Sequence, residues 1–487
     1  MYANSDKDIP ADVTPILPDD VNSGKAGPAP PSYEEVMGQY ETSINSSQSD
    51  IPSLAYIDIM PRILKRGNLK NNVMPTFQPF QEMVNGANSW LANNPNLAVW
   101  KCETVERKVL PGQNEAGVLV DLDSMNHFES AWGCNCYVFG IRLWLTQRPA
   151  DQKGAQEIGL VNITPTPKEI PYTSVHQMGF GGLGVRHYMS TYRVHTLLTY
   201  EGLRKCVQDF NAKVKDNPIP GSILNVETAT LKFAEGWGIQ SAESVAEMSS
   251  WHEVSGMTGR RLTQVLRLFY VKGPSTTPQI EIAEFVPTQI SQSGLGKSAR
   301  FADFKDAEHS LAEWLRQQSG IKILNIETRE AKYSTFFNQT LELNTDSTDD
   351  FDFPMFQTSK LRFLRVFYTS APSVSSFMHT ALTTRLFPPV RLNKGKKRFE
   401  SMVETMARID AWLKVTGLPI FGVETVSFLD EGPSSFTKSQ YSLRGFVGKN
   451  WVTAIRLYFP TAFLEPSPEL LPPLPQGNGG SSTCTLF

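Results

Sequence analysis

A short Glu-Thr signature recurs four times, and it limits the fold of this chain more than any other feature. The glutamates lie about 100 residues apart, an interval the size of a small domain. Similarity at a regular spacing indicates a repeated structural unit. The four copies read Cys102-Glu103-Thr104, Val226-Glu227-Thr228, Ile326-Glu327-Thr328 and Val423-Glu424-Thr425.

An amphipathic helix pattern precedes each copy. Apolar residues recur at spacings of three and four, so they share one face of a helix that can pack on a sheet. The four apolar sets are Phe80, Met83, Val84, Ala87 and Leu91; Leu203, Cys206, Val207, Phe210 and Val214; Phe304, Ala307, Leu311, Trp314 and Leu315; and Phe399, Met402, Val403, Met406 and Leu413.

Two strands follow each helix pattern. The first carries the glutamate and alternates between apolar and polar residues, as a half-buried strand does. The second carries an arginine within an apolar run. If the two strands are neighbours, each glutamate faces an arginine in a cross-strand ion pair. The expected pairs are Glu103 with Arg142, Glu227 with Arg267, Glu327 with Arg365, and Glu424 with Arg456.

These charged residues are interpreted as structural, because a catalytic site is not normally kept in four copies. No catalytic residue is therefore predicted. The expected fold is α+β, with four tandem diverged repeats, each an amphipathic helix on a small, mainly antiparallel sheet. The repeats could stack in line, close into a ring or form two pairs; pairing is favoured, because edge strands need cover. The expected boundaries are residues 57–172, 173–290, 291–390 and 391–466.

Residues 1–56 are predicted to be a disordered acidic tail. Residues 1–50 hold nine acidic and two basic residues and few aromatic ones, too little apolar surface to form a core. The segment contains Pro30-Pro31-Ser32-Tyr33. Pro-Pro-x-Tyr is a ligand type for WW domains, since prolines favour the extended helix that these domains bind. Pro30, Pro31 and Tyr33 are the predicted WW-binding residues.

The sequence Pro28-Ala29-Pro30-Pro31-Ser32-Tyr33-Glu34-Glu35 resembles two known kinds of tail. One is the late-domain segment in matrix proteins of enveloped negative-strand RNA viruses. The other is the Pro-Pro-x-Tyr tail of cellular adaptors that recruit HECT-type ubiquitin ligases. The first resemblance implies a role in budding, and the second implies recruitment of a ligase.

Residues 467–487 are predicted to be a second disordered tail, rich in Pro, Gly and Ser. It ends in Cys484-Thr485-Leu486-Phe487, which resembles a prenylation signal with Cys484 as the lipidated residue. One lipid chain anchors weakly, so a second membrane signal is expected. A basic cluster suits anionic lipid headgroups, and residues 471–475 form a proline-rich candidate ligand for an SH3 domain. The cluster comprises Arg391, Lys394, Lys396, Lys397 and Arg398.

Other site types lack support in the sequence. The five cysteines, with Cys134 and Cys136 as a lone C-x-C, fit neither a disulfide framework nor a metal site. Residues 179–184 match G-x-G-x-x-G, but a strand-like run follows where a dinucleotide site needs a helix, so a hairpin or mobile loop is expected. No cofactor and no nucleic-acid partner are predicted.

The predicted function is that of a non-enzymatic adaptor. The start of the chain lacks a secretory signal, and no apolar run is long enough for a membrane helix, which favours a cytoplasmic protein at the inner leaflet. Its expected partners are WW-domain proteins and the membrane surface, and self-association is left open. The alternatives are a matrix-like, self-assembling structural protein and an enzyme whose site lies between repeats.

Overall fold

The computed structural model combines α-helices with antiparallel strands in several small sheets, an α+β fold. It describes residues 54–69, 73–111, 118–130, 135–149, 154–182, 185–232, 245–253, 260–292, 299–333, 343–352, 358–370, 382–393, 398–443 and 447–475. They all belong to one unit, residues 51–487. Most of residues 1–56 and 467–487, the predicted tails, lie outside the described residues.

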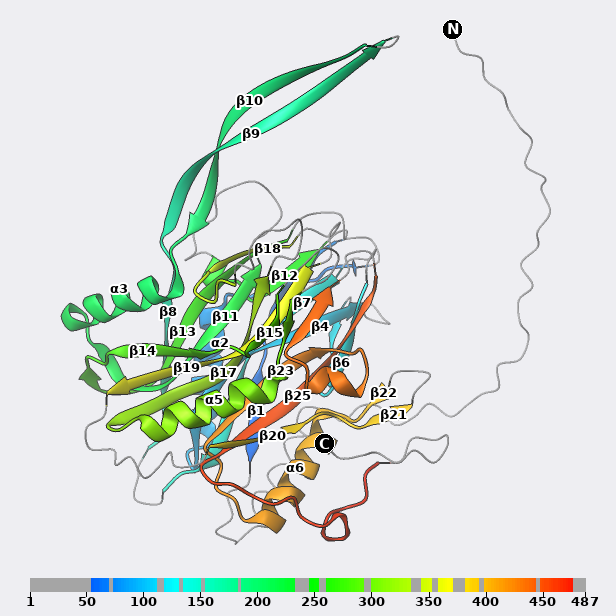
Figure 1. Ribbon diagram of the computed structural model, residues 1–487. Coiled ribbons are helices and arrows are strands. Elements are labelled where there is room, and N and C mark those ends of the chain that lie inside the picture. Colours follow the sequence, from blue (N-terminus) through cyan, green and yellow to red (C-terminus); the bar gives the residue numbers. More distant parts are fainter. Residues whose placement is uncertain are drawn as a thin grey trace. The chain divides into compact units, whose positions relative to one another are not determined.

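One order of elements occurs four times among the described residues (Figure 1). A short first strand is followed by a hairpin, a helix, a long strand, a short strand and a second long strand. In the first group an additional strand, β5, follows the first long strand. The first group comprises β1 (Ala55–Ile59), β2 (Ile63–Lys65), β3 (Thr76–Phe77), α2 (Phe80–Asn93), β4 (Leu97–Pro111), β5 (Val118–Val120), β6 (Asn126–Glu129) and β7 (Asn135–Gln147).

The other three groups keep this order. The second comprises β8 (Ile158–Ile163), β9 (Pro167–Gly182), β10 (Val185–Tyr200), α3 (Leu203–Asp216), β11 (Ile219–Lys232), β12 (Ser250–Glu253) and β13 (Arg260–Thr276). The third comprises β14 (Ile280–Phe285), β15 (Gln289–Ser291), β16 (Arg300–Phe301), α5 (Phe304–Gln317), β17 (Ile321–Tyr333), β18 (Asp349–Asp352) and β19 (Thr358–Ser370). The fourth comprises β20 (Thr383–Phe387), β21 (Arg391–Asn393), β22 (Arg398–Phe399), α6 (Met402–Thr416), β23 (Gly422–Leu429), β24 (Gln440–Leu443) and β25 (Lys449–Phe459).

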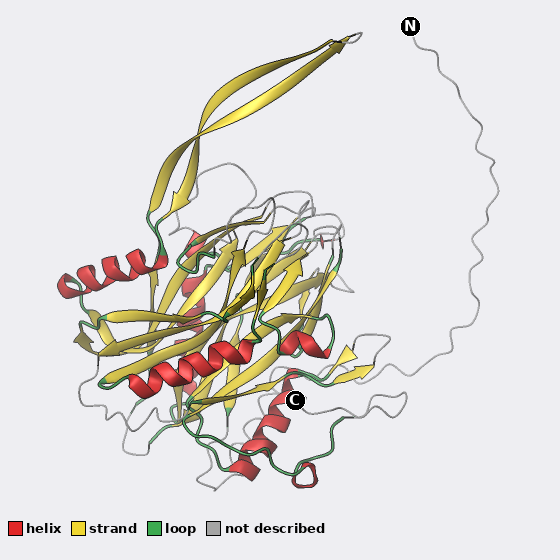
Figure 2. Ribbon diagram, in the orientation of Figure 1, coloured by secondary structure: helices red, strands yellow, loops and turns green. Residues whose placement is uncertain are grey.

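Each group forms a sheet whose central strand is the second long strand. The strand orders are β1-β7-β4, β8-β13-β11, β14-β19-β17 and β20-β25-β23, all antiparallel. Figure 2 shows that these sheets form the centre of the body and that the helices lie around them. The two long strands of each sheet are neighbours, as expected. Their register places each signature glutamate opposite the arginine assigned to it.

The short strand of each group joins the sheet of another group. β12 pairs with β7, β18 with β13, and β24 with β19, so three groups each extend the sheet before them. β6 of the first group pairs with β25 of the fourth and closes the cycle. The expected arrangement in two pairs is therefore wrong, because each sheet receives its extra strand from the following group around a ring.

The predicted helix faces are largely the buried ones. In α2 and α3 the buried residues are the predicted sets, and in α5 only Trp314 is partly exposed. α6 differs from the prediction. Phe399 lies in β22, before the helix begins with a capping box between Ser401 and Glu404. Val403 is 38% exposed, because the buried face instead follows Thr405, Ile409 and Trp412.

The helices also cover the outer strands of the following sheets. The Asn88 side chain on α2 accepts a hydrogen bond from the Ile158 N–H (2.8 Å) and donates one to the Ile158 carbonyl (2.9 Å) on β8. Asn211 on α3 makes the same pair of bonds with Ile280 on β14. These side chains satisfy backbone groups that an edge strand would otherwise leave unpaired.

No helix within the described ranges is both long and apolar enough to cross a bilayer.

Replacing Asn88 with Ala should lower the free energy of unfolding by about 1–3 kcal/mol, because two backbone groups of buried Ile158 lose their partner. Asn85→Ala is the matched control on the same helix, since Asn85 is exposed. Its effect should stay within about 0.5 kcal/mol. Urea unfolding followed by circular dichroism measures both, and equal losses would contradict this role of Asn88.

Candidate functional site

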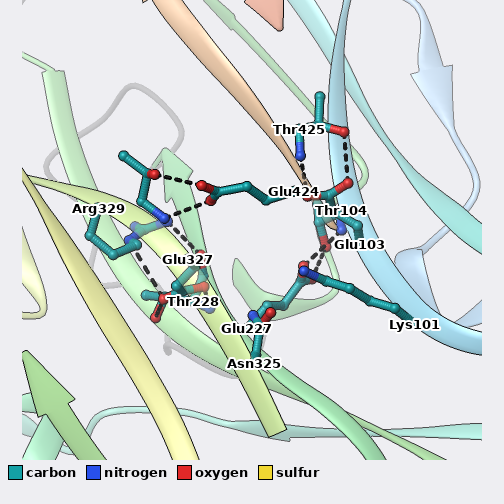
Figure 3. A pocket seen from close by; sticks show the side chains of 11 residues that line it. Lys101, Glu103, Thr104, Glu227, Thr228, Asn325, Glu327, Arg329, Glu424 and Thr425 are labelled. Carbon is teal, nitrogen blue, oxygen red and sulfur yellow. Dashed lines mark hydrogen bonds and ion pairs between the residues drawn. The ribbon is translucent and has the colours of Figure 1, made fainter. Parts of the chain in front are cut away.

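The four signature glutamates lie around one centre (Figure 3). Each lies on the first long strand of its sheet: Glu103 on β4, Glu227 on β11, Glu327 on β17 and Glu424 on β23. At the Glu-Thr positions these strands pair with the arginine-bearing strand on one side. On the other side, the neighbouring group supplies side chains in place of a strand.

Each glutamate accepts two hydrogen bonds from the signature threonine of the preceding group. Thr228 donates its backbone N–H to Glu327 Oε2 at 2.9 Å and its hydroxyl to Oε1 at 2.5 Å. Thr328 binds Glu424 in the same way, with both distances 2.7 Å. Thr104 binds Glu227 through the same two donors, with a backbone distance of 2.8 Å.

The cycle closes between the fourth group and the first. Thr425 donates its N–H and its hydroxyl to the two oxygens of Glu103, both at 2.7 Å. The four strands therefore follow one another in the order β4, β11, β17, β23 and back to β4. We call these four junctions the Glu-Thr ring.

An arginine completes each junction. Arg142, Arg267 and Arg365 donate from Nη1 to the hydroxyls of Thr425, Thr104 and Thr228 at 3.0, 2.7 and 3.0 Å. Arg456 donates to the Thr328 hydroxyl in the same way. Each threonine hydroxyl thus donates to a carboxylate and accepts from a guanidinium. All the glutamates are at most 8% exposed and all the arginines at most 2%.

The predicted ion pairs differ among the groups. Glu424 and Arg456 are 2.8 Å apart, whereas Glu327 and Arg365 are 3.9 Å apart. Arg365 makes its shorter contact, 2.8 Å, with Glu284 on β14.

In the first two groups the arginines have other close partners. Arg142 binds Asp58 on β1 through Nε and Nη2, both at 2.7 Å. Arg267 donates to Thr104 and to the Ala246 carbonyl. The opposed Glu and Arg residues are therefore neighbours in every sheet, but the shared threonine links them more regularly than a direct ion pair does.

Further contacts join neighbouring groups. The Asn225 side chain on β11 accepts from the Cys102 N–H and donates to the Cys102 carbonyl, each at 2.9 Å. The Lys101 ammonium donates to the Val423 carbonyl across the closing junction. Asn225 and Lys101 both lie two residues before a signature glutamate, so this position also binds the neighbouring edge.

The first residues of three helices cover the arginines of the following groups. The guanidinium of Arg267 lies 3.3 Å from the ring centre of Phe80, which begins α2. Arg456 lies 4.4 Å from the ring centre of Phe304, which begins α5. At α6, the sulfur of Met402 is 4.0 Å from Arg142 Nη1. Aromatic faces attract cations, so the contacts of Phe80 and Phe304 stabilise the buried charges of Arg267 and Arg456.

The ring encloses a small polar cavity of about 90 Å³. Its lining consists of the ring glutamates and threonines together with Lys101, Asn325 and Arg329. This space can hold a few water molecules. No histidine lines it, and no metal-binding cluster of His, Cys, Asp and Glu occurs in the described part of the chain.

The pKa of Glu227 is altered by its surroundings. Burial raises its pKa to about 7, against the lowering effects of Arg267 and of the two hydrogen bonds from Thr104. A pKa near neutrality can mark a general acid or base. Both oxygens of Glu227 are already bound by Thr104, and the other three lining carboxylates are likewise bound by threonines of the neighbouring groups.

The other predicted sites lie apart from the ring or outside the described residues. Pro30, Pro31, Tyr33, Cys484 and Cys134 are outside them, as are Lys394, Lys396 and Lys397 of the basic cluster. Of the two described members, Arg391 binds Asp430 at 2.6 Å and lies over the Phe399 ring, whereas Arg398 is exposed. In the segment 471–475, Leu471 is partly buried against the core under α6, and Pro472 and Pro473 are exposed.

The ring threonines were not predicted as site residues. Their signal was present, because threonine follows the glutamate in all four copies. Strand alternation assigns Thr and Glu to opposite faces. The alternation rule does not anticipate an interaction in which the threonine backbone N–H points sideways to a carboxylate on a neighbouring strand.

Comparisons of the chain with known protein families, with curated proteins and with solved structures find no match.

Thr228→Val should lower the free energy of unfolding by roughly 2–4 kcal/mol, because buried Glu327 and Arg365 each lose a partner. Thr228→Ser keeps the hydroxyl and should cost about 1 kcal/mol for the lost methyl group. Chemical unfolding of both variants measures the difference. If valine is tolerated as well as serine, the hydroxyl does not join the two groups.

The raised pKa of Glu227 predicts a pH-dependent stability. Between its ordinary value of 4.5 and about 7 the folded state binds the proton more tightly than the unfolded state. Its contribution is complete below pH 4.5 and is lost as the pH rises through 7. From pH 5.5 to 8, the wild type should lose roughly 2 kcal/mol of unfolding free energy relative to Glu227→Gln, which cannot ionise. Denaturant curves at several pH values test this, and parallel pH profiles would contradict it.

Proposed function

We propose that residues 54–475 form a rigid, non-enzymatic interaction platform made of four diverged copies of one unit. The observation that carries the proposal is the Glu-Thr ring: every signature glutamate is occupied by a threonine of the preceding copy. Recurrence of one polar contact at four junctions is what a structural role requires. An active site would instead leave a carboxylate free for substrate.

The order of elements supports unit boundaries that follow the sheets. β8, β14 and β20 each pair with the long strand of the sheet that comes after them in the chain. We therefore propose units of residues 55–147, 158–276, 280–370 and 383–459. In the second, third and fourth of these units, the first strand belongs to its own sheet, whereas the boundaries expected from the sequence place it at the end of the preceding unit.

The adaptor function combines this platform with the two tails. Pro30, Pro31 and Tyr33 bind a WW domain, such as that of a HECT-type ubiquitin ligase. A prenyl group on Cys484 holds the protein at the inner leaflet, so that the platform brings the WW-domain partner to the membrane. This accounts for motifs at both ends of the chain around a body whose four ring glutamates are all bound by threonines.

A matrix-like structural protein is the second candidate. It is favoured by the resemblance of residues 28–35 to viral late-domain segments. Expression of the protein alone in eukaryotic cells separates the two candidates, because a matrix-like protein releases particles into the medium and an adaptor does not.

Tyr33→Ala should weaken binding to an isolated HECT-ligase WW domain by about 30-fold, as expected for loss of a central aromatic contact. Tyr40→Ala is the matched control, because it removes the same side chain seven residues along the same segment. Isothermal titration calorimetry with the full chain measures both affinities. Equal affinities for the wild type and Tyr33→Ala would exclude this WW-binding site.

A further inference from the structure

The hairpin of the second group is much longer than the other three. β9 and β10 have 16 residues each, whereas the strands of the β2–β3, β15–β16 and β21–β22 hairpins have two or three. The ladder runs from Pro167 and Tyr200 to Gly182 and Val185, and these strands pair only with each other among the described strands. Figures 1 and 2 show it running out from the sheets. We call it the β9–β10 arm.

An arm of this length that pairs with no other described strand needs a partner. A two-stranded ribbon is at best marginally stable alone in water. Its outer edges also present backbone N–H and carbonyl groups with no strand beside them. The sheets of the body avoid this through helix side chains such as Asn88 and through the Glu-Thr ring. The arm has no such cover from a described strand.

The composition of the arm indicates an anionic partner. Residues 170–198 contain no Asp or Glu, although the whole chain has 49 such residues in 487, and the one acid of the arm, Glu169, lies at its base next to Lys168. The same stretch contains Arg186 and Arg193, three histidines and four aromatic residues, Tyr172, Phe180, Tyr188 and Tyr192. A segment with positive but no negative side chains suits a negatively charged surface.

A bilayer surface fits these residues better than a second copy of the arm. Pairing of two arms would bring arginines together with only Glu169, at the base of β9, to offset them. Aromatic side chains are enriched at the membrane–water interface, where their rings lie at the level of the headgroups. Arginines near such a surface are attracted to anionic lipids. Gly179 and Gly181 of the G-x-G-x-x-G match lie at the end of β9, and the run after the match forms β10, a strand where a dinucleotide site needs a helix.

We infer that the β9–β10 arm binds anionic lipid headgroups at a bilayer surface, with Arg186 and Arg193 as the main contacts. Strand alternation places these two arginines on opposite faces of the ribbon, so the arm enters the headgroup layer edgewise with headgroups on both faces. This inference rests on the proposed function, which locates the protein at a membrane. The arm is a second membrane contact, separate from Cys484.

The first test is vesicle sedimentation with the full chain produced in bacteria, which do not prenylate it. One set of vesicles is pure phosphatidylcholine. The other contains about 30% phosphatidylserine, which gives it roughly the negative surface charge of an inner leaflet. The wild type should bind only the charged vesicles, and binding should weaken as salt rises. Absence of wild-type binding overturns the inference.

The second test changes the two arginines. Arg186→Gln with Arg193→Gln should weaken binding to the charged vesicles about 30-fold. Arg66→Gln with Arg300→Gln is the matched control: it removes the same charge from exposed residues at two short hairpins, and binding should stay within about twofold. Equal losses in the two double variants overturn a specific role of the arm.

A third variant replaces residues 170–198 with a short glycine turn, as in the other three hairpins. It should lose vesicle binding and keep the urea midpoint of the body. Unchanged vesicle binding overturns the inference. So does a wild-type dimer in sedimentation velocity that this variant loses, since the arm is then covered by a second copy.

Cys484→Ser in eukaryotic cells separates this inference from the proposed function. If the Cys484→Ser protein leaves the membrane and the arm variants bind vesicles as well as the wild type, lipid binding by the arm is excluded and the prenyl anchor is kept. Membrane retention of Cys484→Ser, with loss of vesicle binding in the arm variants, defeats the prenyl anchor and supports the arm.

Discussion

A threonine hydroxyl held between a carboxylate and a guanidinium is the interaction on which the body of this protein depends. It occurs at four junctions, and at each one the three side chains come from two different groups. The backbone N–H of the threonine adds a second donor to the same carboxylate. The contact therefore fixes the position and the register of neighbouring sheets, which non-directional apolar packing alone would not do.

Burial makes this interaction demanding. Moving a carboxylate and a guanidinium out of water costs several kcal/mol for each ion, and only good geometry with further hydrogen bonds offsets that cost. The ring supplies both, and Phe80, Phe304 and Met402 cover three of its four arginines from the helix side. A half-formed junction would leave buried polar groups unpaired, so the ring favours one arrangement of the four groups over looser alternatives.

The sequence predicted the local features well and the long-range ones poorly. The apolar stripes of α2 and α3 and the facing of Glu227 and Arg267 follow from periodicities that act over a few residues. The exchange of β6, β12, β18 and β24 between sheets could not be predicted, because short strands without strong alternation carry no information about their partner. Strand periodicity also missed Thr228, since it describes faces and says nothing about contacts along an edge. At α6, capping at Ser401 fixes where the helix begins, and this shifts the stripe away from Val403.

Pairing between the first and last groups has a consequence for synthesis on the ribosome. Glu103 and Thr425 are 322 residues apart, and β6 must wait for β25 before it can join a sheet. The nascent chain therefore carries a buried-type carboxylate and an open strand without their partners until nearly all of the body has been translated. Until then, the open strand can pair with another nascent chain, which is a characteristic failure of such an architecture. Formation of the junction between Thr425 and Glu103 closes the ring within one chain and removes this possibility.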